Sequence, residues 1–173
     1  MTPLIVFSHL RWGFVFQRPQ HLLSRIARER QVIFIEEPVF CSTGHPRWEM
    51  ERPLENVIVC RLHTPSESHG FTNEQLDWIE PALKDLLDDL VIEDQCDVWF
   101  YTPMVVSLLE VLQPRLVIYD CMDELTAFKN APPVMRDNER LLLEKADLVF
   151  TGGPSLYLAK KDQHALCRRG RRL

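Results

Sequence analysis

The sequence predicts an α/β protein built on a doubly wound, mostly parallel sheet of six strands with helices on both faces. Two observations lead to this prediction. Six short apolar runs are continuous rather than alternating, which is typical of strands buried on both faces of a sheet. Segments with helical spacing of apolar residues separate these runs, and alternating strands and helices form parallel sheets with right-handed crossovers. The six runs span residues 3–7, 31–35, 56–60, 97–101, 115–119 and 147–151.

The first third of the chain contains one helix and two long connections. Residues 18–30 predict a helix because apolar side chains recur there at helical spacing, and Pro19 suits its first turn. The next strand ends at an acidic pair followed by proline. Residues 38–56 and 62–72 are then expected to form loops, and loops of this length within a compact domain are often functional.

The rest of the chain continues the alternation. A long helix begins at the capping-box spacing of Thr72 and Gln75, and its apolar face follows at intervals of three and four residues. Thr102, followed by proline, is a typical N-cap for a short apolar helix. Two further helices flank the last strand. They are expected to end near residues 146 and 161.

The predicted sheet places three loops at one edge. Six strands in this rhythm most simply adopt the Rossmann-like order 3-2-1-4-5-6, in which the direction of winding reverses between the first and fourth strands. Ligands of such sheets bind above the carboxyl ends of the strands at this reversal. We therefore expect residues 8–18, 101–104 and 120–124 to line a site.

The loop after the first strand carries large polar side chains where nucleotide-binding folds usually carry glycines. No G-x-G-x-x-G or G-x-x-x-x-G-K-[ST] motif occurs, so we expect no dinucleotide held by such a loop and no cofactor. Directional donors beside an aromatic face suit hydroxyl-rich or phosphate-bearing ligands. The candidate ligand-binding residues of this loop are Arg11, Trp12, Gln17, Arg18 and His21. Alternatively, Trp12, Phe14 and Phe16 pack beneath the loop and the arginines are solvated.

Three carboxylates follow the fifth strand. A carboxylate within hydrogen-bond reach of a hydroxyl can act as its general base, and we expect Asp123 to do so, with Asp120 as second candidate. His9, at the end of the first strand, is the third candidate base. Thr102 and Glu124 are expected to contact the substrate. The alternatives are caps and turns made by the two aspartates, a Mg²⁺ site made by the carboxylates, and a structural role for His9.

The cysteines and histidines do not predict a metal site. The five cysteines form no C-x-x-C pair and are odd in number, which fits reduced thiols in the cytoplasm. One group lies in or beside residues 38–72, but structural zinc sites usually show tight paired spacing. Its members are Cys41, His45, Cys60, His63 and His69.

Charge and hydropathy exclude several classes of partner. The formal net charge is −5, and the last seven residues hold four arginines, which leaves about −9 on residues 1–166. An acidic body argues against nucleic acid as a partner. No stretch approaches the ~20 apolar residues of a membrane span, and the N-terminus lacks the basic region of a signal peptide. We expect a cytoplasmic protein, at most peripheral to the inner membrane face, with residues 163–173 as a basic, disordered tail.

Several stretches, taken together, point to a known family. They are HLRW-x4-QRPQHLL, VIFIEEP, VIYDCMDEL and ADLVFTGGPSLY. Together they resemble the N-terminal half of bacterial glycosyltransferases with two Rossmann domains, the GT-B type, and most closely enzymes of cell-surface polysaccharide synthesis. The resemblance covers residues 4–161. It implies an acceptor-binding N-terminal domain, a C-terminal domain that binds nucleotide-sugar, and catalysis in the cleft between them, usually without an essential metal.

On this resemblance we expect residues 1–162 to be the acceptor-side domain of a glycosyltransferase, with the donor-binding domain absent from the chain. In the full enzyme, a sugar would pass from a nucleotide-sugar donor to a hydroxyl of a carbohydrate or lipid-linked acceptor. Arg11, Arg18 and Gln17 would position the acceptor or the donor phosphate. The chain alone would then be inactive, and its protein partner would be a separate C-terminal half or a second copy.

Two alternatives from other classes stay open. The first is a non-catalytic binding or regulatory module that keeps the same Rossmann-like fold. The second is a self-sufficient single-domain hydrolase that uses the group Asp120, Asp123 and Glu124, with Mg²⁺ dependence. The absence of a G-x-S-x-G motif argues against a serine hydrolase.

Overall fold

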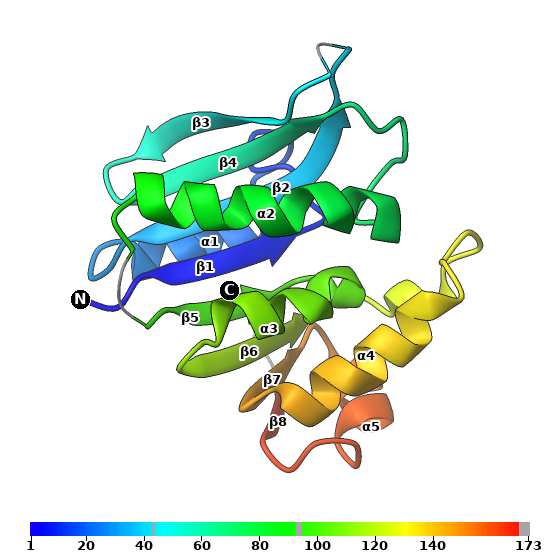
Figure 1. Ribbon diagram of the computed structural model, residues 1–173. Helices are drawn as coiled ribbons and strands as arrows, with labels where there is room; N and C mark the ends of the chain where they lie inside the picture. Colours follow the sequence, from blue (N-terminus) through cyan, green and yellow to red (C-terminus); the bar gives the residue numbers. More distant parts are fainter. Residues whose placement is uncertain (43, 93–94, 170–173) are drawn as a thin grey trace.

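The computed structural model describes residues 1–42, 44–92 and 95–169, and the framework of this part is one eight-stranded sheet (Figure 1). The strands lie in the order β3-β4-β2-β1-β5-β6-β7-β8. Only the β3–β4 pair is antiparallel among the described strand pairs. The strands are β1 (Leu4–Ser8), β2 (Val32–Phe40), β3 (Arg47–Leu54), β4 (Val57–Thr64), β5 (Asp97–Phe100), β6 (Leu116–Cys121), β7 (Leu148–Thr151) and β8 (Cys167–Arg169).

The six predicted strands are all present and lie in the predicted order. They correspond to β1, β2, β4, β5, β6 and β7. Their sheet order, β4-β2-β1-β5-β6-β7, is the order 3-2-1-4-5-6 along the chain. The winding therefore reverses between β1 and β5, and the doubly wound, mostly parallel α/β fold is confirmed.

Two edge strands were not predicted, so the sheet has eight strands rather than six. β3 occupies part of the expected loop 38–56 and pairs antiparallel with β4. Its sequence, RWEMERPL, has no apolar run, and its charged side chains suit an edge strand that faces water. β8 lies within the segment expected to be a disordered tail, and Cys167 in it is buried against the core. Residues 170–173 of that tail lie outside the described residues.

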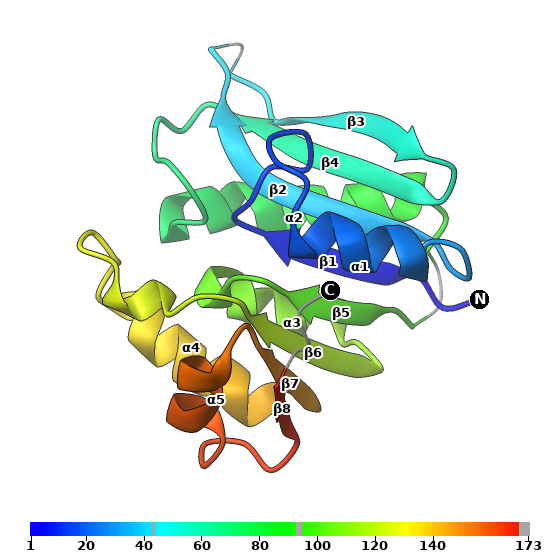
Figure 2. The ribbon, with the colours of Figure 1, turned by 180° about the vertical axis from the view of Figure 1, so that it is seen from behind.

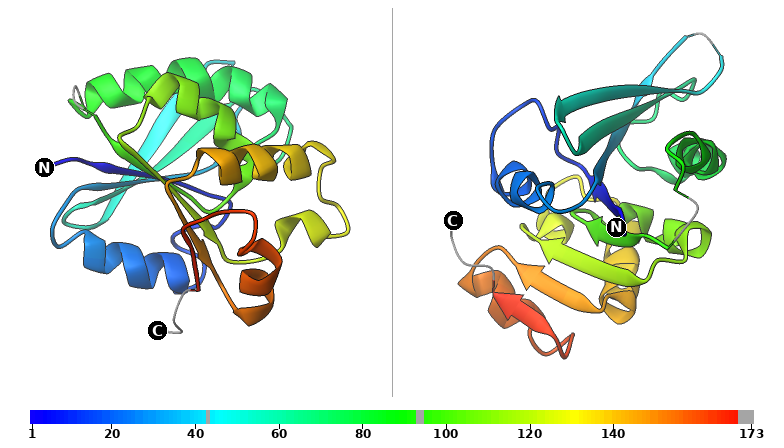
Figure 3. Two further views of the ribbon diagram at one scale, coloured as in Figure 1. Left: turned by 90° about the horizontal axis from the view of Figure 1, so that it is seen from below. Right: turned by 90° about the vertical axis from the view of Figure 1, so that its left-hand side faces the viewer.

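Helices cover both faces of the sheet, as predicted. α1 lies on one face, whereas α2, η1, α3 and α4 lie on the other (Figures 1, 2 and 3). The predicted short helix after Thr102 is a 3₁₀ helix followed by a single α-helical turn. The helices are α1 (Arg18–Ile26), α2 (Asn73–Asp89), η1 (Pro103–Leu108), α3 (Leu109–Leu112), η2 (Leu125–Ala127), α4 (Val134–Lys145) and α5 (Pro154–Lys160). None of the helices in the described part of the chain is long and apolar enough to cross a membrane.

The central strand β1 shows why the apolar runs are continuous. Leu4 and Val6 belong to a core cluster that includes Leu23 of α1. Ile5 and Phe7 belong to a second cluster, formed with residues of α2 and α4 on the opposite face. Because both faces of β1 are covered, every position from Leu4 to Phe7 has to be apolar.

Parallel pairing brings the carboxyl ends of β1, β5 and β6 to one edge of the sheet. Phe7 pairs with Phe100, and Phe100 pairs with Tyr119. The segments that follow these three strands therefore start side by side. These are the segments predicted to line a site.

Candidate functional site

An ion pair joins the start of α1 to the end of β6. Arg18, the first residue of α1, donates from Nε to both carboxylate oxygens of Asp120, at 2.9 Å for Oδ2 and 3.2 Å for Oδ1. The side chain of Asp120 is fully buried, and that of Arg18 is 20% exposed. The two segments predicted to meet at the edge of the sheet therefore do lie together.

Arg18 keeps its capacity to bind an anion although it is paired. Asp120 engages Nε, and no described residue accepts a hydrogen bond from the two Nη atoms. A guanidinium held in this way can bind a phosphate or carboxylate through two nitrogens, and the N-terminus of α1 adds positive potential. Burial raises the pKa of Asp120, and Arg18 opposes this only in part. Since both its oxygens face Arg18, Asp120 is better placed to orient the guanidinium than to act as a free base.

His9 and Asp123 lie at the same edge. Burial lowers the pKa of His9, while the backbone of Tyr101 and the negative charge of Asp123 raise it in part. The imidazole is therefore mostly neutral at pH 7 and able to accept a proton. Its Nδ1 is buried and has no hydrogen-bond partner among the described residues. Asp123 is exposed, so an imidazole and an exposed carboxylate are both available here as bases.

A second buried carboxylate, Glu36 on β2, holds the loop after β1 in place. Glu36 accepts hydrogen bonds from Nη1 of Arg11 at 3.1 Å, Nε of Arg61 at 2.8 Å and the backbone N–H of Trp12 at 2.7 Å. The Trp12 ring packs edge-on against Phe34, with the ring centroids 5.1 Å apart. Two residues predicted to bind ligand, Arg11 and Trp12, therefore support the loop.

Gln17 and His21 flank Arg18 at the start of α1. Gln17 is the N-cap residue, and its backbone N–H donates to Oε1 of Gln20 at 3.0 Å. His21 is exposed, and its ring meets the ring of Phe16 edge-on at 4.6 Å. Phe14 and Phe16 do not pack beneath the loop, since they are 82% and 65% exposed. That part of the alternative interpretation is wrong, whereas its packing of Trp12 is confirmed.

Thr102 and Glu124 are engaged in local structure. Thr102 is buried, and its hydroxyl accepts from the backbone N–H two residues on, at the start of η1. Glu124 accepts from Nζ of Lys160 at 3.1 Å, and Lys160 also donates to Glu139 at 2.7 Å. The hydroxyl of Tyr119 donates to the same Glu139. This buried network joins β6, α4 and α5, and the sequence offered no pattern that links its members.

Gly152 packs closely against the segment that carries Asp123. The backbone N–H of Gly152, just after β7, donates to the carbonyl of Cys121 at 2.8 Å. A Cβ at position 152 would overlap the backbone of Met122. Glycine is therefore required for this close approach of two chain segments.

The three carboxylates of the alternative Mg²⁺ site do not converge. Asp120 faces Arg18 and Glu124 faces Lys160, which leaves Asp123 as the one member with no ion pair to a described residue. Within residues 1–42, 44–92 and 95–169, no group of three or more His, Cys, Asp or Glu side chains could hold a metal ion.

Two members of the cysteine and histidine group around residues 38–72 are placed in surroundings unlike those of a metal ligand. Cys60 points into the core, and burial raises the pKa of its thiol to about 12. His63 shares a 2.6 Å hydrogen bond with Glu49 across the β3–β4 pair.

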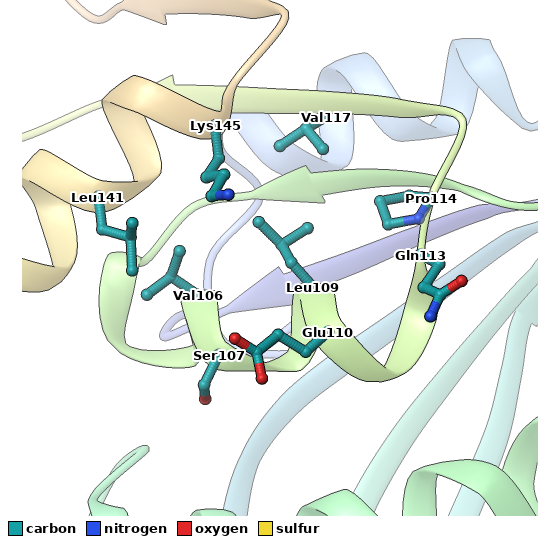
Figure 4. A pocket seen from close by; sticks show the side chains of 9 residues that line it. All are labelled: Val106, Ser107, Leu109, Glu110, Gln113, Pro114, Val117, Leu141 and Lys145. Atoms are coloured by element: carbon teal, nitrogen blue, oxygen red, sulfur yellow. The ribbon is translucent and has the colours of Figure 1, made fainter.

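The described residues also form hollows away from this edge, including the following two. One, of about 510 Å³, opens between η1–α3 and α4 (Figure 4). The other, of about 730 Å³, is lined by Met1, Thr2, Arg28, Glu29, Arg30 and Arg115. Neither hollow is lined by a residue predicted to belong to the site.

The fold has a counterpart among solved structures. A structure described as trehalose-6-phosphate from E. coli bound with UDP-2-fluoro glucose matches with a TM-score of 0.54 and 12% sequence identity. The match covers 94% of this chain and 42% of that chain, so this chain spans less than half the length of the structure that it resembles. At this identity the likeness concerns the fold. No family model and no curated protein matches the sequence.

Proposed function

We propose that this chain is the acceptor-side part of a glycosyltransferase that moves a sugar from a nucleotide-sugar donor to a hydroxyl. The observation that carries the proposal is the Arg18–Asp120 pair, which leaves an oriented guanidinium at the point where the sheet reverses its winding. The resemblance of four sequence stretches to GT-B enzymes supports it. So does the likeness in fold to an E. coli protein bound to UDP-2-fluoro glucose, which is a nucleotide sugar.

The proposed chemistry needs a base and an anion-binding group on the acceptor side. Asp123, or the neutral imidazole of His9, removes the proton of the acceptor hydroxyl. The hydroxyl oxygen then bonds to the anomeric carbon of the donor sugar. The bond from that carbon to the donor phosphate oxygen breaks, and the nucleoside diphosphate leaves with the electron pair. Arg18 binds a phosphate of the acceptor or the donor, and the donor-binding domain stabilises most of the charge on the leaving group.

We also propose a biological role, an acceptor class, a cellular compartment and a source of the donor-binding domain. The resemblance favours a role in bacterial cell-surface polysaccharide synthesis, with a carbohydrate or lipid-linked acceptor. Four buried thiols, Cys60, Cys96, Cys121 and Cys167, suit the reducing cytoplasm. The donor-binding domain would come from another polypeptide or from a further part of the same protein.

The experiment that tests the proposal combines turnover with binding. The purified chain is incubated with UDP-glucose and with GDP-mannose, with and without Mg²⁺, and release of nucleotide is measured. No turnover is expected from residues 1–173 alone, because the proposed transfer also needs a donor-binding domain. Addition of α-D-glucose 1-phosphate to the ¹⁵N-labelled chain is expected to shift the NMR signals of residues 8–18 and 120–124.

The same experiment separates the alternatives. Mg²⁺-dependent turnover by the chain alone would support the single-domain hydrolase and contradict the proposal. A non-catalytic module would bind at the same edge, but Asp123→Ala would leave transfer unchanged once the donor-binding domain is supplied. The proposal expects that variant to lose transfer while it still binds the sugar phosphate.

A further inference from the structure

The hollow between η1–α3 and α4 lies apart from the proposed acceptor site and has no role in it. Its wall on one side is η1 and α3, and its wall on the other side is α4 (Figure 4). α3 is a single turn that ends at Leu112; its C-cap residue Gln113 has a left-handed φ of 41°, and Pro114 follows. The helical cover of the sheet therefore stops early, and Val117 of β6 helps to line the space that remains.

The hollow has the size and lining of a small-molecule site. Its volume of about 510 Å³ lies within the range of ligand pockets, which is roughly 300–1,000 Å³. Val106, Leu109, Val117 and Leu141 supply apolar surface. Leu141 is 41% exposed, so part of its apolar surface is open to a ligand.

Two opposite charges line the same hollow without neutralising each other. Figure 4 shows the side chain of Lys145 extending from α4 into the space, while Glu110 projects from the α3 wall. Neither side chain forms a salt bridge or hydrogen bond with a described residue, so their charged ends are more than 4.0 Å apart. An ammonium and a carboxylate that flank apolar surface complement a ligand carrying both charges and an apolar substituent.

We propose that this hollow binds a small apolar zwitterion of the α-amino acid type. The carboxylate of the ligand pairs with Lys145, and its ammonium pairs with Glu110. Its apolar side chain covers Leu109 and Leu141. A simple fatty acid or phosphate ester fits less well, because Glu110 would repel it. A ligand that carries only a positive charge fits less well, because Lys145 would repel it.

The test uses L-leucine as the probe, with the ¹⁵N-labelled chain observed by NMR. L-leucine is expected to shift the signals of residues 106–117 and 141–145 in a saturable manner. Lys145→Gln and Glu110→Gln are each expected to weaken binding about tenfold, since hydrogen bonds to charged groups contribute on that scale. The matched controls are Lys84→Gln and Glu80→Gln on exposed positions of α2, and both are expected to bind like the unmodified protein.

Ligand analogues separate this proposal from other occupants. Glycine lacks the apolar group, N-acetyl-L-leucine lacks the ammonium and L-leucinamide lacks the carboxylate, so each is expected to bind at least about tenfold more weakly. Binding of N-acetyl-L-leucine or L-leucinamide as tight as that of L-leucine would overturn the zwitterion proposal. The absence of saturable binding, or equal binding by all four variants, would overturn it as well. These outcomes are independent of sugar phosphate binding at residues 8–18 and 120–124.

Discussion

Glu36 of β2 and Asp120 of β6 are both buried carboxylates that directly follow an apolar run, and both contact arginine, yet their surroundings differ. Glu36 accepts from Arg11, Arg61 and the backbone of Trp12, so both of its oxygens are engaged and it links β2 to β4 and to the loop after β1. Asp120 accepts from the Nε of one arginine, and the Nη atoms of that arginine stay available. We therefore propose that the number of donors distinguishes Glu36, a structural anchor, from Asp120, which leaves the guanidinium of Arg18 able to bind a ligand.

The largest effect on stability is expected from Glu36→Ala. The substitution removes the acceptor shared by two arginines and a backbone N–H, and loss of one partner of a buried pair is costly. Because the arginines remain about a quarter to a third exposed, we expect a loss of about 2–3 kcal/mol in the free energy of unfolding. Urea denaturation measures it. Glu51→Ala, an exposed position on β3, is the control, and an equal effect there would contradict the anchoring role of Glu36.

The next effect concerns the segment that carries Asp123. Gly152→Ala places a methyl group against the backbone of Met122 and is expected to cost about 1–3 kcal/mol in the free energy of unfolding. Gly153→Ala is the neighbouring control, since no atom lies within 4 Å of a Cβ there. Similar thermal stabilities for the two variants would show that the contact between these segments is not tight.

Asp120→Asn is expected to behave unlike Glu36→Ala. Because burial raises the pKa of Asp120, the folded protein holds a proton that the unfolded chain releases when the pH lies between the two pKa values. This contribution to stability is present below the ordinary aspartate pKa of about 4 and is lost as the pH rises through the raised value. The variant cannot titrate, so the stability of the unmodified protein relative to it should fall as the pH rises from about 4.

Because burial already penalises the ionised form of Asp120, we expect Asp120→Asn at neutral pH to destabilise the protein less than Glu36→Ala does. Denaturation with urea at several pH values measures both quantities. A large loss of stability at neutral pH would place Asp120 in the same class as Glu36. A stability difference that rises with pH in favour of the unmodified protein would contradict the sign of the pKa shift.

The smallest effect is a change in the pKa of His9. The negative charge of Asp123 raises this pKa, although burial keeps it below the ordinary value of 6.5. Asp123→Asn is therefore expected to lower it further, as followed by NMR titration of the imidazole. Asp137→Asn on α4 serves as control and should leave the pKa of His9 unchanged. An unchanged value in the Asp123 variant would show that the two candidate bases are not coupled.

The sequence was sufficient for the order of six strands because strands buried on both faces must be apolar throughout. It was not sufficient for β3, whose exposed side chains leave no apolar run. The short strand β8 has the composition of a basic tail, and its pairing with β7 depends on tertiary contacts.

For the site, the strand order was enough to bring Arg18 and Asp120 together across 102 residues. Glu36 follows its apolar run just as Asp120 does, so the pattern could not distinguish their roles. The distinction depends on Arg61, which β4 places beside Glu36. The contact between Lys160 and Glu139 could not be predicted from the sequence either, because it depends on how α4 and α5 are placed.

We propose that Asp120 orients Arg18 so that its guanidinium can bind an anionic ligand. Titration calorimetry of the chain with α-D-glucose 1-phosphate tests it most directly, with Arg18→Gln compared with Arg25→Gln, an exposed arginine on the same helix. We predict that Arg18→Gln weakens binding about tenfold and that Arg25→Gln leaves it unchanged. Equal affinities for the two variants, or no binding by the unmodified protein, would contradict the account.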